Sequence, residues 1–478
     1  MKEEKKNPDL SPINQSSMKH IVVFLLLWFS LSLSGQQLDL NFPQANYAGP
    51  NGPGAVNAMA VYDDVLYLGG NFTSIEGNNR QHLAAIDLKT GQVLDWKATP
   101  NQPVKGITVA DGVVYIWGTF TAVNGMARNS LAALDMGTGA VTSFNPTISF
   151  PGIPGMQTGT IEDVVVQGDT IFLAGYFLSI NGQPRLNLGA VGTDGSLLDW
   201  QPQTSTIPFN HILLAGDLIY GSGPFYFPKN GLVAYNRWTA ELSDWDPDPN
   251  FPGNTFGPLL VDGEDMWVSG PFSGVQFAAD RPYLAKVDRL TGQPENWETE
   301  FGYGYPGTVA IEALVADEEH LYFGGSIHPL FSDSLQHLGR LDRQTGKFDD
   351  WRPTPDLPVQ AMLRYDHYLI VGGRFSSIAD QSRSLLARFD LELSAVDPGG
   401  TVKKWSLFPN PSSGWIRIQC MEEDIVIRVL DITGREVLSR RSGQAASIDL
   451  DLSHLAAGPY MVVMASERGS ERELIIIR

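Results

Sequence analysis

The sequence predicts an all-β protein, a seven-bladed β-propeller followed by a small β-sandwich, and three observations carry that prediction. The 478 residues include 49 glycines and 31 prolines, a proportion that indicates many turns. One unit of roughly forty to fifty residues recurs seven times along the chain. After the seventh copy the repeat gives way to a different pattern of alternating strands. Because every blade of a propeller adds its own layer of core, seven such repeats fit one domain.

The repeats share a pattern of apolar, turn and glycine positions. Each copy contains four short segments of alternating polarity, as expected of four antiparallel strands. In the first copy they span residues 56–62, 65–72, 83–88 and 92–97. Four-stranded units at this spacing predict the blades of a propeller. The seven copies begin at Val56, Val104, Ile161, Phe209, Phe256, Ile311 and Val359.

The seventh copy lacks its fourth segment. After residues 386–392 the chain enters a linker with proline and glycine, 394–402. Near the other end, residues 37–44 (QLDLNFPQ) resemble the fourth segment that begins at Leu94. We therefore expect the N-terminal strand to pair with the last blade and close the ring over residues 36–393, because closure removes exposed sheet edges.

An apolar run precedes this N-terminal strand. Residues 21–33 are apolar, follow a basic pair and end in small residues, a pattern typical of a signal peptide over residues 1–35. The run is shorter than the roughly 20 apolar residues that span a membrane, so we expect no transmembrane segment in the mature chain. Met18 is an alternative initiator, in which case the first 17 residues would not belong to the protein.

Composition limits the partners of this chain. The 33 basic and 53 acidic side chains give a formal charge of -20, which repels nucleic acids and anionic lipid surfaces. The single cysteine, Cys420, excludes an intrachain disulfide and a thiolate metal cluster. The eight histidines are scattered, and the sequence carries no familiar catalytic or metal-binding motif. We therefore assign no catalytic residue, metal or cofactor.

A tryptophan and an arginine recur in most copies. The stretch AIDLKTG before Trp96 resembles the tryptophan-docking motif of quinoprotein dehydrogenases, but four residues rather than that family's three separate the glycine from the tryptophan. One extra residue in a strand turns a side chain to the other face, so we expect no quinone cofactor. A residue that recurs in most repeats is expected to have a structural role that every blade requires. The tryptophans are therefore expected to pack between blades, and the arginines to form ion pairs or backbone clamps.

Ligand-binding residues would instead break the symmetry of the repeats. Two connections between consecutive repeats are long, residues 150–160 and 301–310, and the fourth copy has an aromatic loop. All three lie at the same end of the predicted sheets, where they would form one rim for carbohydrate or protein, or else only fill space. The predicted rim residues are Phe150, Phe225, Tyr226, Phe227, Tyr303 and Tyr305.

The second residue of each innermost strand offers another candidate site. It is polar in six of the seven copies. We expect these side chains to ring the mouth of the central channel, where they would hold waters or a cation, or serve only as a solvated lining. The predicted channel-mouth residues are Lys105, Glu162, Asn210, Glu312 and Gln360, with Asn57 and Gly257 at the equivalent positions.

The last region, residues 403–478, carries the motifs FPNPSSG, DITGREV and LSHLAAGPY in that order. They are similar to the type A sorting domains of the type IX secretion system of Bacteroidetes. The alternating strands indicate a small Ig-like β-sandwich. The resemblance implies that the secretion machinery carries the protein across the outer membrane, after which the domain is removed and the protein is released or attached to the cell surface. The motif residues are Pro409, Asn410, Pro411, Gly414, Gly434, Gly458 and Tyr460.

The repeat itself is similar to delta-60-type repeats, a propeller family of secreted bacterial proteins that largely lack a known function. With no catalytic grouping in the sequence, we expect a secreted or surface-attached binding module for a glycan or protein ligand. One alternative is an enzyme of quinoprotein-like or polysaccharide-cleaving type, which a cluster of carboxylates or a metal at the channel mouth would favour. Another is a purely structural propeller.

Overall fold

The computed structural model describes the repeat region over residues 37–49, 53–150, 158–249, 257–275, 282–301, 309–327 and 335–391. In the C-terminal region it describes 405–408, 415–420, 426–431, 435–441, 447–456, 458–466 and 469–477. Every regular element within these ranges is a β-strand. None of the described segments forms a helix with the length and apolarity to cross a membrane. Contacts divide the chain into a repeat unit, Ser34–Ser394, and a second unit that holds Ala395–Arg478.

Each repeat forms one antiparallel sheet, and we number these sheets 1 to 7 in chain order. Sheet 1 pairs β4 (Val65–Asn71) with β3 (Ala55–Tyr62) on one side and with β7 (Leu83–Asp87) on the other. Sheets 2 to 7 repeat this pattern with β8 (Val104–Ala110), β9 (Val113–Gly118), β12 (Leu131–Asp135); β14 (Thr160–Gln167), β15 (Thr170–Tyr176), β18 (Leu188–Gly192); β19 (His211–Ala215), β20 (Leu218–Ser222), β21 (Leu232–Asn236); β22 (Leu259–Asp262), β23 (Asp265–Ser269), β24 (Leu284–Asp288); β25 (Val309–Ala316), β26 (His320–Ile327), β27 (Leu338–Asp342); and β28 (Val359–Tyr365), β29 (Tyr368–Gly373), β32 (Leu386–Asp390).

The fourth segment of sheets 1 to 6 is shorter than the sequence predicts. In sheet 1 it is a single bridge between Ile86 and Val93, and the other five sheets have one equivalent bridge each. A tight turn brings the segment back, because Asp87 Oδ1 accepts a hydrogen bond from the backbone N of Thr90 at 2.7 Å and Gly91 takes a φ of 70°. The chain then leaves the sheet and inserts Trp96 toward the next one.

The recurring tryptophans pack between consecutive sheets, as the sequence predicts. The Trp96 indole donates a hydrogen bond to the carbonyl of Asp135 in sheet 2 at 3.2 Å and meets Tyr67 edge-on, with ring centroids 5.2 Å apart. Trp200 and Trp245 donate in the same way to the sheets that follow them. Edge-to-face aromatic pairs add stability beyond the area they bury.

The recurring arginine is a backbone clamp. In sheet 1, Arg80 Nη2 donates to the carbonyl of Leu94 at 2.7 Å, and Arg128 and Arg185 make the same contact in sheets 2 and 3. Each guanidinium therefore fixes the short fourth segment to its own sheet, because its planar fork can donate several hydrogen bonds at once.

The N-terminal segment joins the last sheet to the first. β1 (Gln37–Leu38) pairs antiparallel with β32 and gives sheet 7 its fourth strand, and β2 (Ala45–Asn46) pairs with β5 (Ser74–Ile75) of the first repeat. Between them, Arg383 Nη1 donates to the carbonyl of Leu40 at 3.1 Å. Phe42 is buried with Val56 of sheet 1 and Ile370 of sheet 7 in one apolar cluster. Phe42 thus stands where other repeats place tryptophan.

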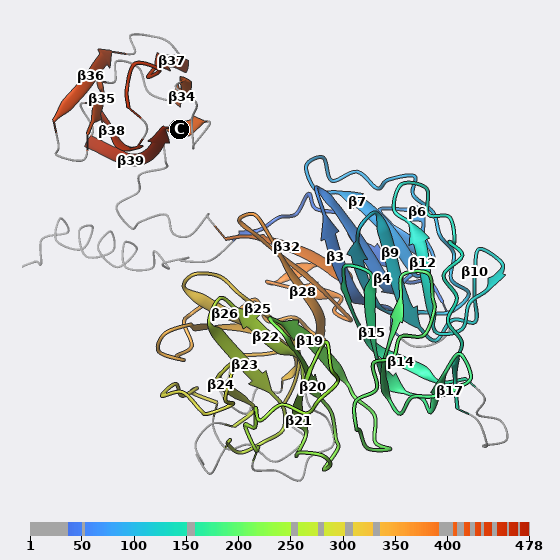
Figure 1. Ribbon diagram of the computed structural model, residues 1–478. Helices are drawn as coiled ribbons and strands as arrows, with labels where there is room; N and C mark the ends of the chain where they lie inside the picture. The colour runs from blue at the N-terminus through green and yellow to red at the C-terminus, as the bar shows by residue number, and fades with distance from the viewer. Residues whose placement is uncertain are drawn as a thin grey trace, which may run out of the picture. The chain divides into compact units, whose positions relative to one another are not determined.

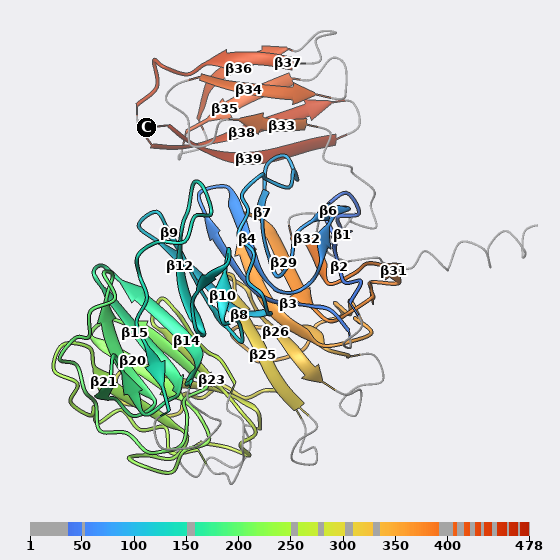
Figure 2. The ribbon, with the colours of Figure 1, turned by 90° about the vertical axis from the view of Figure 1, so that its right-hand side faces the viewer.

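The first strands of the sheets contact one another in the order β3, β8, β14, β19, β22, β25, β28, and β28 contacts β3 in turn. Figures 1 and 2 both show the strands of sheet 7, in orange, beside those of sheet 1, in blue. Several repeats also contain short strands that pair in small sheets of their own. Besides β2 and β5 they are β6 (Asn78–Asn79), β10 (Ala122–Val123), β11 (Met126–Ala127), β13 (Ile148–Ser149), β16 (Ser179–Ile180), β17 (Gln183–Pro184), β30 (Ser377–Ile378) and β31 (Gln381–Ser382).

The C-terminal unit consists of two antiparallel sheets. One contains β33 (Trp405–Phe408), β34 (Trp415–Cys420) and β37 (Ser447–Asp451). The other contains β36 (Glu436–Arg441), β35 (Val426–Leu430), β38 (Gly458–Ser466) and β39 (Gly469–Ile477). Alternate residues of both sheets, such as Ile418 and Val429, share one buried core. This is how two amphipathic sheets bury their apolar faces.

Candidate functional site

The predicted aromatic rim is only partly exposed. Phe150 is 6% exposed and packs on Tyr176 with ring centroids 4.6 Å apart, and Phe225 is 1% exposed against Phe209. These two rings therefore lie in the interior and not on an exposed rim, because an aromatic side chain is stabilised by burial against its neighbours. The rim candidates Tyr226 and Phe227 are 59% and 51% exposed, and Tyr303 and Tyr305 lie outside the described residues.

The channel-mouth candidates lie together. The second residues of all seven first strands line one cavity of about 690 Å³. The structure adds Asp163, His211 and Trp117 to this lining. The cavity residues from the equivalent positions are Asn57, Lys105, Glu162, Asn210, Gly257, Glu312 and Gln360.

A repeated β-bulge places these side chains. In sheet 1, Val56 pairs with Gly70 and Ala58 with Gly69, so that Asn57 has no partner across the strand pair. The same register shift occurs at Lys105, Glu162, Glu312 and Gln360. A bulge leaves the extra residue unpaired and turns it out of the regular alternation. The opposite glycine is required, because a Cβ on Gly70 would lie 2.2 Å from the carbonyl oxygen of Ala55.

One side of the cavity is a charged group from sheets 2, 3 and 4. Lys105 Nζ forms an ion pair with the Glu162 carboxylate. Asp163 accepts hydrogen bonds from the backbone N of Val164 at 2.8 Å and of Ile212 at 2.9 Å, which ties sheet 3 to sheet 4. His211 Nδ1 lies 3.8 Å from Asp163 Oδ2.

Burial sets the protonation of this group. It raises the pKa of Asp163 to about 7 and, helped by the nearby Lys105 charge, lowers the pKa of His211 to about 4. Burial also lowers the pKa of Lys105. At neutral pH the imidazole is therefore uncharged and Asp163 is close to half ionised.

The other side of the cavity holds Glu312 and Gln360, from sheets 6 and 7. Glu312 Oε1 accepts a hydrogen bond from Ser326 Oγ at 3.3 Å. Burial raises the pKa of Glu312, against the opposing effects of hydrogen bonds from Ser326 and Gln360 and of the positive charge of Arg374. Gln360 Oε1 is buried and has no hydrogen-bond partner among the described residues.

Sequence reasoning did not select Asp163 or His211. Strict alternation along a strand places neighbours on opposite faces, so Glu162 and Asn210 were the expected lining residues. The bulge at Glu162 breaks that alternation and lets Asp163 line the cavity as well. The glycine that recurs in each second strand, opposite the bulge, was the available signal.

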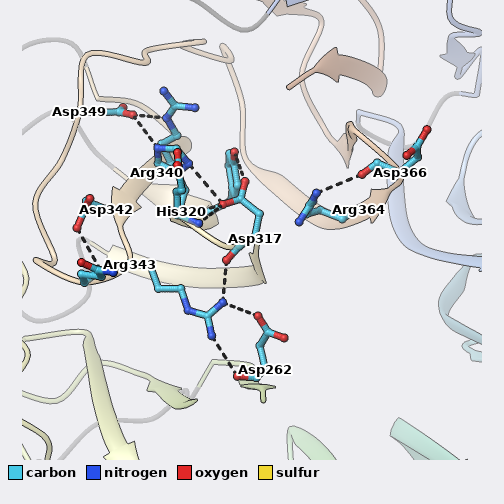
Figure 3. Close-up of polar contacts among 12 residues, drawn as sticks. Asp262, Asp317, His320, Arg340, Asp342, Arg343, Asp349, Arg364 and Asp366 are labelled. Atoms are coloured by element: carbon cyan, nitrogen blue, oxygen red, sulfur yellow. Dashed lines mark hydrogen bonds and ion pairs between the residues drawn. The ribbon is translucent and has the colours of Figure 1, made fainter. Parts of the chain in front are cut away.

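A second cavity, of about 490 Å³, lies where the turns after β25 and β28 approach each other. Figure 3 shows the polar contacts around it, with the pair Arg364 and Asp366 apart from the group around Asp317. Tyr322 and the backbone N of His320 donate to Asp317 at 2.8 and 2.6 Å. Arg340 pairs with Asp349. Burial would raise the pKa of Asp317, but hydrogen bonds from His320 and Tyr322 hold it well below its usual range.

Arg343 extends this charged group to sheet 5. Its Nη1 lies 2.6 Å from Asp262 Oδ2, and its Nη2 lies 2.7 Å from Asp265 Oδ2. The same guanidinium donates to the carbonyl of Asp317 at 2.7 Å (Figure 3). Within the described ranges, no three or more His, Cys, Asp or Glu side chains are grouped to hold a metal ion.

Comparison with known proteins decides the identity of the C-terminal region. Residues 406–478 match the family model of a secretion system C-terminal sorting domain. The C-terminal unit is a type IX secretion sorting domain. Residues 369–395 match a β-propeller domain of unknown function. The protein is thus an all-β propeller that the type IX secretion system exports to the cell surface or beyond. This confirms the localisation predicted from the sequence.

Several solved structures resemble the chain at low identity. The designed protein Ika8 is 12% identical, with a TM-score of 0.42 over 91% of this chain and 100% of its own. PorZ, a bacterial surface component of the type IX secretion system of Porphyromonas gingivalis, is 11% identical, with a TM-score of 0.30 over 88% and 70%. The WD40 propeller domain of Doa1 is 11% identical, with a TM-score of 0.46 over 75% and 98%. No curated protein matches the sequence.

Two of the sorting-motif residues are described. Gly458 begins β38 with a φ of 148°, and the Tyr460 hydroxyl donates to the carbonyl of Ala456 at 3.0 Å while its ring packs on the core. Both therefore shape the sandwich of the sorting domain. Pro409, Asn410, Pro411, Gly414 and Gly434 lie outside the described residues, as do the predicted signal peptide over 1–35 and linker over 394–402.

Proposed function

We propose that the exported propeller is a binding module whose ligand enters the channel-mouth cavity. One observation carries the proposal: the framework of the repeats recurs, but the residues that line the cavity change from sheet to sheet. Trp96, Arg80 and Gly70 have counterparts in most repeats. Across the seven lining positions, by contrast, the residue is Asn, Lys, Glu, Asn, Gly, Glu and Gln. Differences confined to one cavity fit recognition rather than folding.

The architecture in this proposal is a closed ring of seven blades over residues 36–393. Pairing of β1 with β32, pairing of β2 with β5 and contact of β28 with β3 support it. The sorting domain over 403–478 would be an Ig-like sandwich that is removed after export, as its two sheets and shared core support. Removal would leave the propeller as the working part of the protein.

The ligand in this proposal is a small polar molecule or the end of a glycan. A cavity of about 690 Å³ lies within the range of typical ligand sites. Its amides, carboxylates and imidazole can exchange hydrogen bonds with hydroxyl groups. The exposed pair Tyr226 and Phe227 follows a second strand, at the end of the sheets where the first strands begin, and would extend the surface for a longer glycan.

An array of glycans and peptides, probed with the purified full chain, tests this proposal. We expect specific ligands whose binding falls at least tenfold in the variant Asn210→Leu, which removes polar atoms from the cavity, while Asn78→Leu on an exposed hairpin serves as the matched control. Melting temperatures of both variants verify that the fold is retained. Binding that survives Asn210→Leu, or an array without any ligand, would contradict a binding role for this cavity.

A polysaccharide-cleaving enzyme is a second candidate, and the cavity favours it through one observation. Asp163 and Glu312 are two carboxyl groups with raised pKa values in one cavity, and a general acid in glycoside hydrolysis needs such a raised pKa. Release of reducing ends from any glycan found on the array, abolished by Asp163→Asn, would establish cleavage in place of simple binding.

A further inference from the structure

At the channel-mouth cavity, several hydrogen-bond donors are engaged within the described part of the protein, whereas one buried acceptor is not. Several of its donors are already used: Lys105 Nζ pairs with Glu162, Trp117 Nε1 donates to the carbonyl of Glu162 at 2.8 Å, and Asn57 Nδ2 donates to the carbonyl of Val104 at 2.8 Å. The acceptor Oε1 of Gln360, by contrast, is buried and has no partner in the part of the chain that the structure describes. A ligand that completes this cavity must therefore bring hydrogen-bond donors.

The charges of the cavity also favour a ligand that brings hydrogen-bond donors, and one that is positively charged. Glu162, Asp163 and Glu312 are acidic, and Lys105 is the one basic residue that lines this cavity among the described residues. Lys105 is engaged by Glu162. On the Glu312 side, no lysine or arginine is among the described residues that line the cavity. Arg374 acts on Glu312 only as a nearby charge. His211 is neutral above about pH 4 and adds no positive charge.

We infer that the Glu312 and Gln360 side of the cavity receives the primary ammonium group of a small ligand, an inference that rests on the proposed binding function. An ammonium group carries three donors and one positive charge. Glu312 supplies the carboxylate, and rotation of the Gln360 amide would bring its buried Oε1, which lacks a partner among the described residues, to the same group. Charge-assisted hydrogen bonds are about twice as strong as neutral ones, so this pairing outweighs recognition of a neutral hydroxyl.

A divalent metal fits this position less well than an ammonium group. Calcium takes six to eight oxygen ligands, whereas Glu312 and Gln360 offer one carboxylate and one amide oxygen. An amino sugar and the amine of a lysine side chain share the ammonium chemistry. The cavity volume admits either, so the experiment must separate them.

Burial of Glu312 gives the site a pH dependence. Because the pKa of Glu312 is raised, its carboxyl group takes up a proton at a higher pH than an ordinary glutamate, and an entering ammonium group must displace that proton. The other titratable groups facing the cavity are Lys105 and Glu162, which pair with each other, and Asp163 and His211. Affinity for an amine should therefore fall as the pH is lowered, and the fall should begin at a higher pH than for an ordinary glutamate.

The test is calorimetric titration of the full chain with matched probes. Glucosamine is compared with glucose, and Nα-acetyl-lysine amide with its Nε-acetylated form, with calcium chloride as a further arm. We expect at least one amine to bind on the order of tenfold more tightly than its neutral partner. Glu312→Gln and Gln360→Met should each remove that preference, while Glu318→Gln, an exposed carboxylate outside this cavity, should keep it. Melting temperatures show whether each variant folds.

The outcomes separate this inference from the proposed function. If neutral glycans from the array bind as well as amines and Glu312→Gln changes neither, the ammonium site is refuted while a binding function stands. If calcium binds and competes with the amines at Glu312, the site is a cation site of another kind and the inference is wrong. If neither amines nor arrayed ligands bind to the folded chain, both proposals fail.

Discussion

The two cavities of the propeller are similar in polarity but differ in how their charges are satisfied. In the cavity of Figure 3, Asp317 receives hydrogen bonds from Tyr322 and His320, and Arg340 pairs with Asp349. At the channel mouth, Asp163 and Glu312 are buried enough to raise their pKa values, and Gln360 Oε1 has no partner. The first arrangement is satisfied within the protein, whereas the second, in the function proposed above, would be completed by a ligand.

The largest expected effect comes from breaking the satisfied cavity. Arg343→Met should lower the free energy of unfolding by about 3 kcal/mol, because it leaves Asp262, Asp265 and the Asp317 carbonyl without their shared donor. The Arg343 side chain is 15% exposed; after its removal the 48% exposed Asp262 can be hydrated and Asp265 keeps its ion pair with Lys286, so the Asp317 carbonyl loses most. Denaturant unfolding measures the change, and ligand binding at the channel mouth should be unaffected. A loss below roughly 0.5 kcal/mol, the scale of a surface ion pair, would contradict a structural role.

A smaller effect, with opposite signs in the two cavities, is expected in the dependence of stability on pH. The folded state raises the pKa of Asp163 from roughly 4 to about 7, so folded protein binds more protons between those values and its stability falls as the pH rises through them. The pKa of Asp317 is lowered, so its contribution is present above roughly pH 4 and is lost as the pH falls below that value.

The variants Asp163→Asn and Asp317→Asn isolate these two contributions. Asp163→Asn should remove a loss of stability on the order of 3 kcal/mol between pH 4 and 7, and Asp317→Asn should flatten the profile on the acid side only. The slope of unfolding free energy against pH is the relevant measurement, because either amide also changes a hydrogen bond. Parallel profiles for the wild type and Asp163→Asn would show that Asp163 keeps an ordinary pKa.

The sequence predicts the strands that surround the two cavities better than the side chains that line them. The expected first strand over 56–62 agrees with β3, because alternation and turn residues are local signals. The lining depends on side chains that come from repeats far apart in the sequence. The bulge that brings in Asp163, and the burial of Phe150 and Phe225, are set by packing against neighbouring sheets, which alternation along one strand does not encode.

The smallest expected change in stability distinguishes the two sides of the channel mouth. Lys105→Met should alter the unfolding free energy by less than about 1 kcal/mol, because the Lys105 side chain is half exposed and its pairing with Glu162 resembles a surface ion pair. The substitution nevertheless removes the basic lining residue and makes the cavity more acidic. Affinity for an amine probe should then rise, by a few fold at low salt and less at high salt, since the added attraction is a screened Coulomb effect. Weaker amine binding in Lys105→Met would contradict an ammonium ligand in this cavity, because a cation gains affinity wherever a nearby positive charge is removed.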